Sequence, residues 1–441
     1  MKTYTLRVAL AALVALTLAG CDLLGLDDRP DPNGPSLEGI LDDPSEANLS
    51  ALAVGIEAAS RVDLHHYLID VGMVGREYWH ISAADPRFTA DLLGRGNAVL
   101  DNNTFYITRP WGARYANVRN GNTMLLALDL NTTLSDAEKA AGRGWARTWI
   151  AYQYLLNLNL TWENGIRFIE PGQDEGGPVV GYAEALTRIA EILDLGAADL
   201  DAAGDAFFFP VSSGFDGFDT PPTFRMVNRG LAARVALYRE DYDAALDFLA
   251  ESFIDPAPTT LGLGAYHVFG PGSGDLLNPF FLPPDATGEA NLVHPSFVTD
   301  AEPGDTRLSK AFDRGEETTF DGLTSRYGVN VYTSSTSPIP IIRNAELILI
   351  RAEARAQTGD LPGAIVDLNL IRTAAGLPAY SGPVTLAGVL DEVLRQRRYE
   401  LYAEGHRWVD VRRFGLLGTL PIDRPGDDVW DRFPIPLNEN V

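Results

Sequence analysis

The chain has 441 residues, and its 60 Asp and Glu residues outnumber its 35 Lys and Arg residues, which gives a formal net charge of −25 at pH 7. A protein this acidic repels phosphate backbones and anionic lipids, so its general field excludes binding to nucleic acid or to an anionic membrane surface. A hydrophobic content of 46% provides for a sizeable core, and the single cysteine excludes an internal disulfide.

The first 20 residues are organised as a secretory signal, in which two basic residues precede an apolar run over 8–18. This run is too short for a transmembrane helix, which needs about 20 residues. The letters LAGC, which end at Cys21, resemble a bacterial lipobox, in which the cysteine thiol is acylated and becomes the new N-terminus. The resemblance predicts a lipoprotein signal peptide over 1–20 and a lipid anchor on Cys21. The acidic stretch 21–36, rich in Pro and Gly, is predicted to be a flexible tether.

Apolar residues recur at three- and four-residue steps over long parts of the chain. This spacing predicts amphipathic helices that pack on one another. The stretches concerned are 46–69, 111–129, 136–160 and 182–203. No long linker interrupts residues 37–441, which we expect to form a single domain.

Two segments, 233–249 and 352–368, share one pattern: a helix, a tight turn marked by Asp241 or Asp360, and a helix that opens with small residues. The pattern resembles the tetratricopeptide helix pair, although no regular 34-residue period runs through the chain. We therefore predict an all-α fold in which tetratricopeptide-like helix pairs form a scaffold. Long stretches dense in Gly, Pro and aromatic residues are expected to cover one side of it. These stretches are 75–110, 161–181, 204–224 and 251–340.

The C-terminal part, over 339–376, 394–415 and 433–439, carries an ordered set of motifs. Their shared letters are Arg343, Ala345, Glu346, Leu349, Ala352, Glu353, Ala354, Asn369, Arg372, Ala375, Gly376, Leu377, Arg397, Arg398, Glu400, Leu401, Glu404, Gly405, His406, Arg407, Asp410 and Arg413. In this order they resemble the SusD/RagB family of outer-membrane nutrient-uptake lipoproteins. The match is close over about the last hundred residues.

The charged residues of these motifs read as parts of a scaffold. Arginines and carboxylates at helical spacing can pair within and across turns, and Thr385 and Gly405 suit the start and the end of a helix. A catalytic alternative would use Glu400, Glu404 and Asp410 as acid and base near His406, but Glu400 and Glu404 share one helix face among arginines. Neighbouring arginines would lower both carboxyl pKa values rather than separate them. The predicted structural residues are Arg343, Glu346, Glu353, Arg397, Glu400, Glu404, Arg407 and Asp410.

The sequence provides little support for a catalytic motif, a metal site or a cofactor site. The metalloprotease, nucleophile-elbow and phosphate-loop motifs do not occur, and the acidic runs lack the full calcium-loop pattern. His65 and His66 are the one histidine cluster, and adjacent helix positions are expected to point in different directions. We predict no metal and no cofactor.

Aromatic residues in the irregular stretches are the candidates for ligand contact, because sugar rings stack their C–H faces on aromatic rings. The resemblance implies that such aromatics lie in 75–110, and Trp79 is expected to be an exposed platform. The alternative is that these rings hold the loops in place. The candidates are Trp79, Tyr78, Tyr106, Tyr266 and Tyr327.

The resemblance implies a surface-exposed outer-membrane lipoprotein that binds a nutrient, such as a glycan, without cleaving it. It also implies delivery to a TonB-dependent transporter of the SusC type. One alternative is a lipid-anchored helical glycoside hydrolase, which needs two carboxylates about 5–10 Å apart. Another is a tetratricopeptide adaptor that binds only protein partners.

Overall fold

The computed structural model describes residues 37–173, 176–273 and 275–437. The predicted signal peptide, the lipidation site Cys21 and the tether 21–36 lie outside the described residues.

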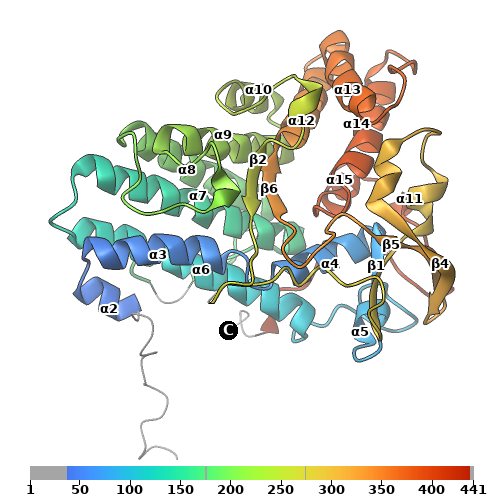
Figure 1. Cartoon of the computed structure of the whole chain (residues 1–441), viewed down its shortest axis with the longest axis horizontal. Helices are drawn as coiled ribbons and strands as arrows, with labels where there is room; N and C mark the ends of the chain where they lie inside the picture. Colours follow the sequence, from blue (N-terminus) through green and yellow to red (C-terminus); the bar gives the residue numbers. More distant parts are fainter. Residues whose placement is uncertain (1–36, 174–175, 274, 438–441) are drawn as a thin grey trace, which may run out of the picture.

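Most of the described chain is helical, which confirms the predicted helical scaffold, and Figure 1 shows its long helices side by side. Each member of the series α3, α6, α7, α8, α9, α10, α12, α13, α14 packs on the next. The helices are α2 (Leu37–Asp42), α3 (Glu46–Ala59), α4 (Leu64–Val74), α5 (Arg87–Ala90), α6 (Phe105–Leu130), α7 (Asp136–Thr161), α8 (Tyr182–Asp201), α9 (Pro221–Tyr238), α10 (Tyr242–Ala250), α11 (Pro295–Thr299), α12 (Asn344–Gln357), α13 (Leu361–Ala374), α14 (Leu386–Glu400) and α15 (Arg407–Arg413). Among the described residues, no helix combines the length and the apolarity that crossing a membrane would require.

The two helix pairs expected from the sequence are α9–α10 and α12–α13. The Asp241 side chain accepts a hydrogen bond from the Ala244 backbone N–H at 3.3 Å, and Asp360 accepts one from Gly363 at 2.9 Å. Each aspartate is therefore the N-cap of the second helix and satisfies one of its free N–H groups. The turn that the sequence marked with Asp is confirmed at both places.

Two helix boundaries differ from the expected ones. The stretch 46–69 is divided into α3 and α4, because the chain turns at Asp63, whose φ of 52° is in the left-handed region. The helix expected to begin near 111 begins at Phe105 and contains Pro110, which cannot donate a backbone hydrogen bond.

The stretches expected to be irregular hold short strands that the sequence analysis did not predict. An antiparallel sheet has the order β1-β3-β5-β4, and Trp79 of β1 is paired with Leu292 of β3. β2 and β6 pair separately. The strands are β1 (Tyr78–Ser82), β2 (Gly264–His267), β3 (Glu289–Val293), β4 (Ala311–Phe320), β5 (Leu323–Val329) and β6 (Ile339–Arg343).

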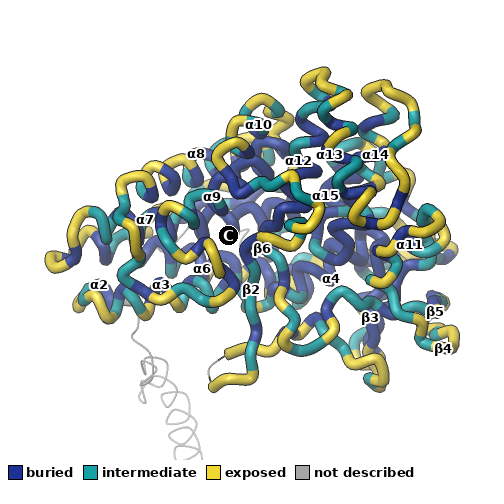
Figure 2. The backbone as a smooth tube through the Cα atoms, turned by 45° about the horizontal axis from the view of Figure 1, so that its top comes forward, coloured by how far each residue is buried: buried dark blue, intermediate teal, exposed yellow. Residues whose placement is uncertain are grey.

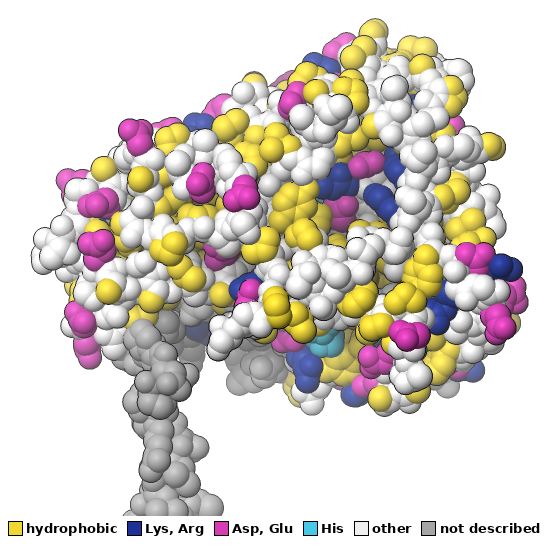
Figure 3. All heavy atoms as spheres, in the orientation of Figure 1, with side chains coloured by type: hydrophobic (Ala, Val, Ile, Leu, Met, Phe, Trp, Pro, Cys, Tyr) yellow, Lys and Arg dark blue, Asp and Glu magenta, His cyan; other side chains and the backbone are white. Residues whose placement is uncertain are grey.

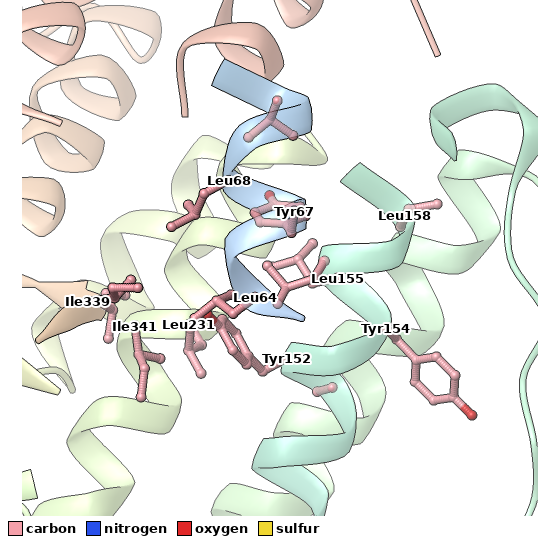
Figure 4. Packing of buried hydrophobic residues seen from close by; sticks show 14 of the residues in the cluster. Leu64, Tyr67, Leu68, Tyr152, Tyr154, Leu155, Leu158, Leu231, Ile339 and Ile341 are labelled. Atoms are coloured by element: carbon pink, nitrogen blue, oxygen red, sulfur yellow. The ribbon is translucent and has the colours of Figure 1, made fainter. Parts of the chain in front are cut away.

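The core joins the helical series to the strands. Figure 4 shows side chains of α4, α7 and β6 directed toward one another, among them Leu64, Tyr152 and Ile339, while Tyr154 points away. In Figure 2, α4 and α15 lie in the buried interior, whereas the β4 end of the sheet lies at the surface. Strand β1 is buried along its whole length, because α4 and β3 pack against it.

Candidate functional site

A cavity of about 320 Å³ lies between α14, α15 and the end of α11. Its helical side chains come from one face of α14, at positions 391, 394, 395, 398 and 399, and one face of α15, at 407, 410 and 411. This spacing of three and four residues places side chains on the same side of a helix. We call this cavity the arginine pocket. It is lined by Asp300, Asp391, Leu394, Arg395, Arg398, Tyr399, Arg407, Asp410, Val411, Leu416 and Thr419.

Two guanidinium groups of the pocket differ in how they are held. Arg398 donates to Asp300 at 3.0 Å and to the Ser296 hydroxyl at 2.6 Å. Arg407 donates from Nε to the Gly75 carbonyl at 3.0 Å. Burial, together with the positive charge of Arg398, lowers the pKa of Arg407 to about 10, so it is still charged at neutral pH.

A chain of buried hydrogen bonds connects the pocket to β1. The Trp79 indole donates to Asp423 Oδ2 at 3.0 Å, and Asp423 Oδ1 lies 2.7 Å from His294 Nε2. His294 Nδ1 accepts from the Ser296 backbone N–H at 3.1 Å and lies 2.8 Å from the Ser296 hydroxyl. That hydroxyl accepts from Arg398, so a continuous series of hydrogen bonds links Trp79 to Arg398.

The expectation that Trp79 is an exposed platform is wrong, because its side chain is 3% exposed. Besides its hydrogen bond to Asp423, its ring lies edge-on against His294 at 5.0 Å. Tyr78, the next candidate, is fully buried and donates to the Leu68 carbonyl at 2.5 Å. Both residues therefore hold β1 in place in this structure.

The other aromatic candidates lie apart, since no ring contact joins any two of the five within the described residues. Tyr106 is also buried, and its hydroxyl lies 3.2 Å from Asp91. Tyr266 is half-buried, and its hydroxyl donates to the Gly262 carbonyl. Tyr327 of β5 is half-buried as well, and these two rings are the candidates that solvent can reach.

The charged residues predicted as structural form buried ion pairs that join α12, α14 and α15. Figure 3 shows acidic and basic side chains together at the bottom of a hollow between β6 and α11. Of the predicted set, Arg407 differs, because it forms no ion pair with a carboxylate among the described residues. The pairs are Arg343 with Glu400 at 2.8 Å and with Glu404 at 2.7 Å, Arg234 with Glu346 at 2.6 Å, Arg397 with Asp410 at 2.7 Å and Arg413 with Glu353 at 2.8 Å.

These pairs also bear on the catalytic alternative. Burial alone would raise the pKa of Glu400, but Arg343 and Lys310 outweigh it and hold the pKa below its usual value. The pKa of Asp410 is lowered in the same way, because Arg397 and Arg413 outweigh burial. A general acid needs a raised pKa. Neither carboxyl group is suited to that role.

His65 and His66 do not point in different directions as expected, because their ring centroids are 4.1 Å apart. With Asp63 they form a group whose ligand atoms lie within 4.8 Å of one another. Arg109 Nη1, however, lies 3.4 Å from His66 Nε2, and its positive charge opposes a cation there.

Glu77, which precedes β1, is a buried acid whose protonation should affect stability. Burial raises its pKa to about 7 despite the opposing effect of Arg407. The unfolded value is near 4.5, so the folded state binds the proton more tightly. This contribution to stability is full below pH 4.5 and is lost as the pH rises through 7.

We expect the difference in unfolding free energy between the wild type and Glu77→Gln to change by about 2–3 kcal/mol between pH 5 and pH 8. The wild type should lose stability relative to the variant as the pH rises. Urea unfolding of both proteins at the two pH values measures this. A difference that does not depend on pH would show that Glu77 is already ionised at pH 5.

Comparisons with known proteins agree with this architecture. The model of the SusD family matches residues 320–431. The SusD-like protein P38 of Formosa agariphila is 32% identical over 139 residues, which are 27% of this chain and 27% of that protein. The aligned region therefore spans little more than a quarter of the curated relative.

Solved structures are similar over nearly the whole fold. A SusD superfamily protein from Bacteroides vulgatus has a TM-score of 0.65 at 15% identity, covering 90% of this chain and 96% of that one. Surface glycan-binding protein A from Bacteroides thetaiotaomicron, in complex with laminarihexaose, has a TM-score of 0.67 at 16% identity, covering 89% and 97%.

Proposed function

Because this chain is a SusD-like protein of the SusD/RagB family, we propose that it is a surface lipoprotein that binds a saccharide without cleaving it. By the same proposal it passes the saccharide to a TonB-dependent transporter of the SusC type in the outer membrane. The likeness to a surface glycan-binding protein solved with laminarihexaose supports the ligand class.

The observation that carries the proposal is the arginine pocket. Its volume of about 320 Å³ falls in the range of small-molecule sites, roughly 300–1,000 Å³. Arg395, Arg398 and Arg407 offer donors to sugar oxygens, and Asp391 and Asp300 offer acceptors. Side chains of both kinds on rigid helices can fix the orientation of a sugar ring.

A saccharide array probed with the full chain, together with a reducing-end assay on every saccharide that binds, tests this function. We expect saturable binding to at least one saccharide and recovery of that saccharide intact. Release of reducing ends would favour the glycoside hydrolase. Binding to proteins with no bound saccharide would favour the adaptor.

The proposed lipid anchor gives a separate prediction, because Cys21 precedes the folded body. Cys21→Ala should appear in the soluble fraction, while the wild type fractionates with outer membranes. Since Cys21 lies outside the described fold, which begins at Leu37, we expect the helical circular dichroism of the two proteins to be the same. A variant that loses its helical signal would contradict the separation of anchor and fold.

A further inference from the structure

The arginine pocket contains a cation, the Arg407 guanidinium, that forms no ion pair with any described residue. Within the described part of the chain, no carboxylate oxygen lies within 4.0 Å of the nitrogens of Arg407. Its one hydrogen bond, from Nε, goes to a backbone carbonyl. Glu77 is the acid that acts on it most strongly, and burial raises the pKa of Glu77 to about 7. Glu77 lies beyond ion-pair distance of Arg407, so it compensates this charge only in part, and less as the pH falls below 7.

The other two arginines of the pocket, Arg395 and Arg398, add to its positive charge. Arg395 has its nearest carboxylate, Glu392, at 3.9 Å, which is too long for a hydrogen bond, and its side chain is 47% exposed. Arg398 pairs with Asp300, whose side chain is 52% exposed, so that pair is screened by solvent. A ligand can replace Asp300 at little cost.

The carboxylates of the pocket do not balance these charges. Asp410 already lies between Arg397, at 2.7 Å, and Arg413, at 3.0 Å. Asp391 is exposed, one helical turn before Arg395. The remaining acid, Asp300, forms its ion pair with Arg398.

Tyr399 supplies a second observation that points to a ligand. It lines the pocket and is 1% exposed, and its hydroxyl has no hydrogen-bond partner among the described residues. A buried polar group without a partner costs about 1–3 kcal/mol. Arg398 lies over the Tyr399 ring at 5.6 Å.

We propose that the arginine pocket binds the anionic group, a carboxylate or a sulfate ester, of an acidic saccharide. The inference rests on the proposed function and names the class of ligand for that site. A guanidinium presents paired N–H donors that match the two oxygens of a carboxylate or sulfate group. Arg407 is the primary contact, because it has no acid of its own. Arg398, which donates a hydrogen bond to Ser296, and Arg395 are the other positively charged contacts.

The test is titration calorimetry of the full chain with three probes of equal length: an oligogalacturonate, its carboxyl-reduced neutral form, and a sulfated galactose oligosaccharide. We expect at least one anionic probe to bind more than tenfold more tightly than the neutral probe. Whichever anionic probe binds more tightly identifies the recognised group as a carboxylate or a sulfate ester. Inorganic sulfate alone should compete only weakly.

Arg407→Gln should weaken binding of the anionic probe more than tenfold and leave any neutral binding unchanged. Arg395→Gln, at a half-exposed position where folding is not at risk, should weaken it severalfold. The matched control is Arg326→Gln, which removes one positive charge from an exposed pair on β5 with Asp313 and should change nothing. The melting temperature of each variant shows whether it is folded.

Equal affinity for the acidic and the reduced probe would overturn the inference and leave the proposed function standing. Unchanged anionic binding in folded Arg407→Gln and Arg395→Gln would overturn it as well. Binding of no saccharide on the array, acidic or neutral, would instead overturn the proposed function.

Discussion

Trp79→Ala should lower the free energy of unfolding by about 3–5 kcal/mol, the range for truncating a buried tryptophan in a core. The Trp79 ring is 3% exposed and lies against His294, and its indole N–H donates to Asp423. The substitution leaves a cavity beside β1 and removes a donor from a buried carboxylate. Chemical unfolding followed by circular dichroism measures the loss.

Trp79→Phe separates the contribution of ring packing from that of the indole hydrogen bond to Asp423. It keeps most of the ring volume but removes the N–H that holds Asp423, so we expect a loss of about 1–2 kcal/mol. Because Asp423 and His294 position Ser296, this variant should also weaken saccharide binding slightly. A Trp79→Ala protein with the wild-type melting temperature and no saccharide binding would restore the exposed-platform interpretation.

Arg397→Ala should cost about 3–5 kcal/mol of stability, because it breaks a buried ion pair and leaves a charge behind. Arg397 Nε lies 2.7 Å from Asp410 Oδ2, and the two side chains are 1% and 4% exposed. Asp410 would keep Arg413 at 3.0 Å, which limits the loss. Urea unfolding of the variant gives the value.

A double-mutant cycle with Asp410→Ala tests whether the pair itself is responsible. We expect the double variant to be less destabilised than the sum of the two single variants, because neither partner is then left unpaired. Additive effects would mean that Arg397 stabilises the domain through packing alone. The exposed pair Arg326–Asp313, at 2.7 Å, is the matched comparison and should couple by less than about 1 kcal/mol.

The helical part of the fold could be predicted because its signals are local. Apolar spacing predicts the helices, Asp241 and Asp360 predict tight turns, and Thr385 predicts an N-cap. In the structure each of these three residues accepts a backbone hydrogen bond as the N-cap of a helix. Gly405 has a positive φ of 87°, but α14 ends at Glu400, so this glycine lies in the turn before α15 and not at the end of a helix as expected. Each of these features depends on residues only a few positions away.

The strands and the burial of Trp79 could not be predicted, because they depend on distant residues. β1 is buried on both faces and lacks the alternation that identifies a half-exposed strand. Trp79 is covered by His294 and Asp423, more than 200 positions away in the chain. An aromatic residue in a loop has the same sequence signal whether it packs inward or faces a ligand.

The arginine pocket could be predicted from the sequence only in part. The spacing of Asp391, Arg395 and Arg398 along α14 could have indicated one polar face. Nothing in the sequence showed that Asp300 and Arg407 would close the other side. The whole motif that contains Arg407 is predicted from the sequence to belong to the scaffold, and Arg397 and Arg413 of the same motif do pair with carboxylates.

The most direct test of the proposed function and its site is a crystal structure of the protein with the saccharide that binds most tightly. We predict that the sugar occupies the arginine pocket, with anionic oxygens within hydrogen-bond distance of Arg407 and Arg398. A saccharide bound elsewhere, such as on the half-buried ring of Tyr327 on β5, with the arginine pocket empty, would contradict the account.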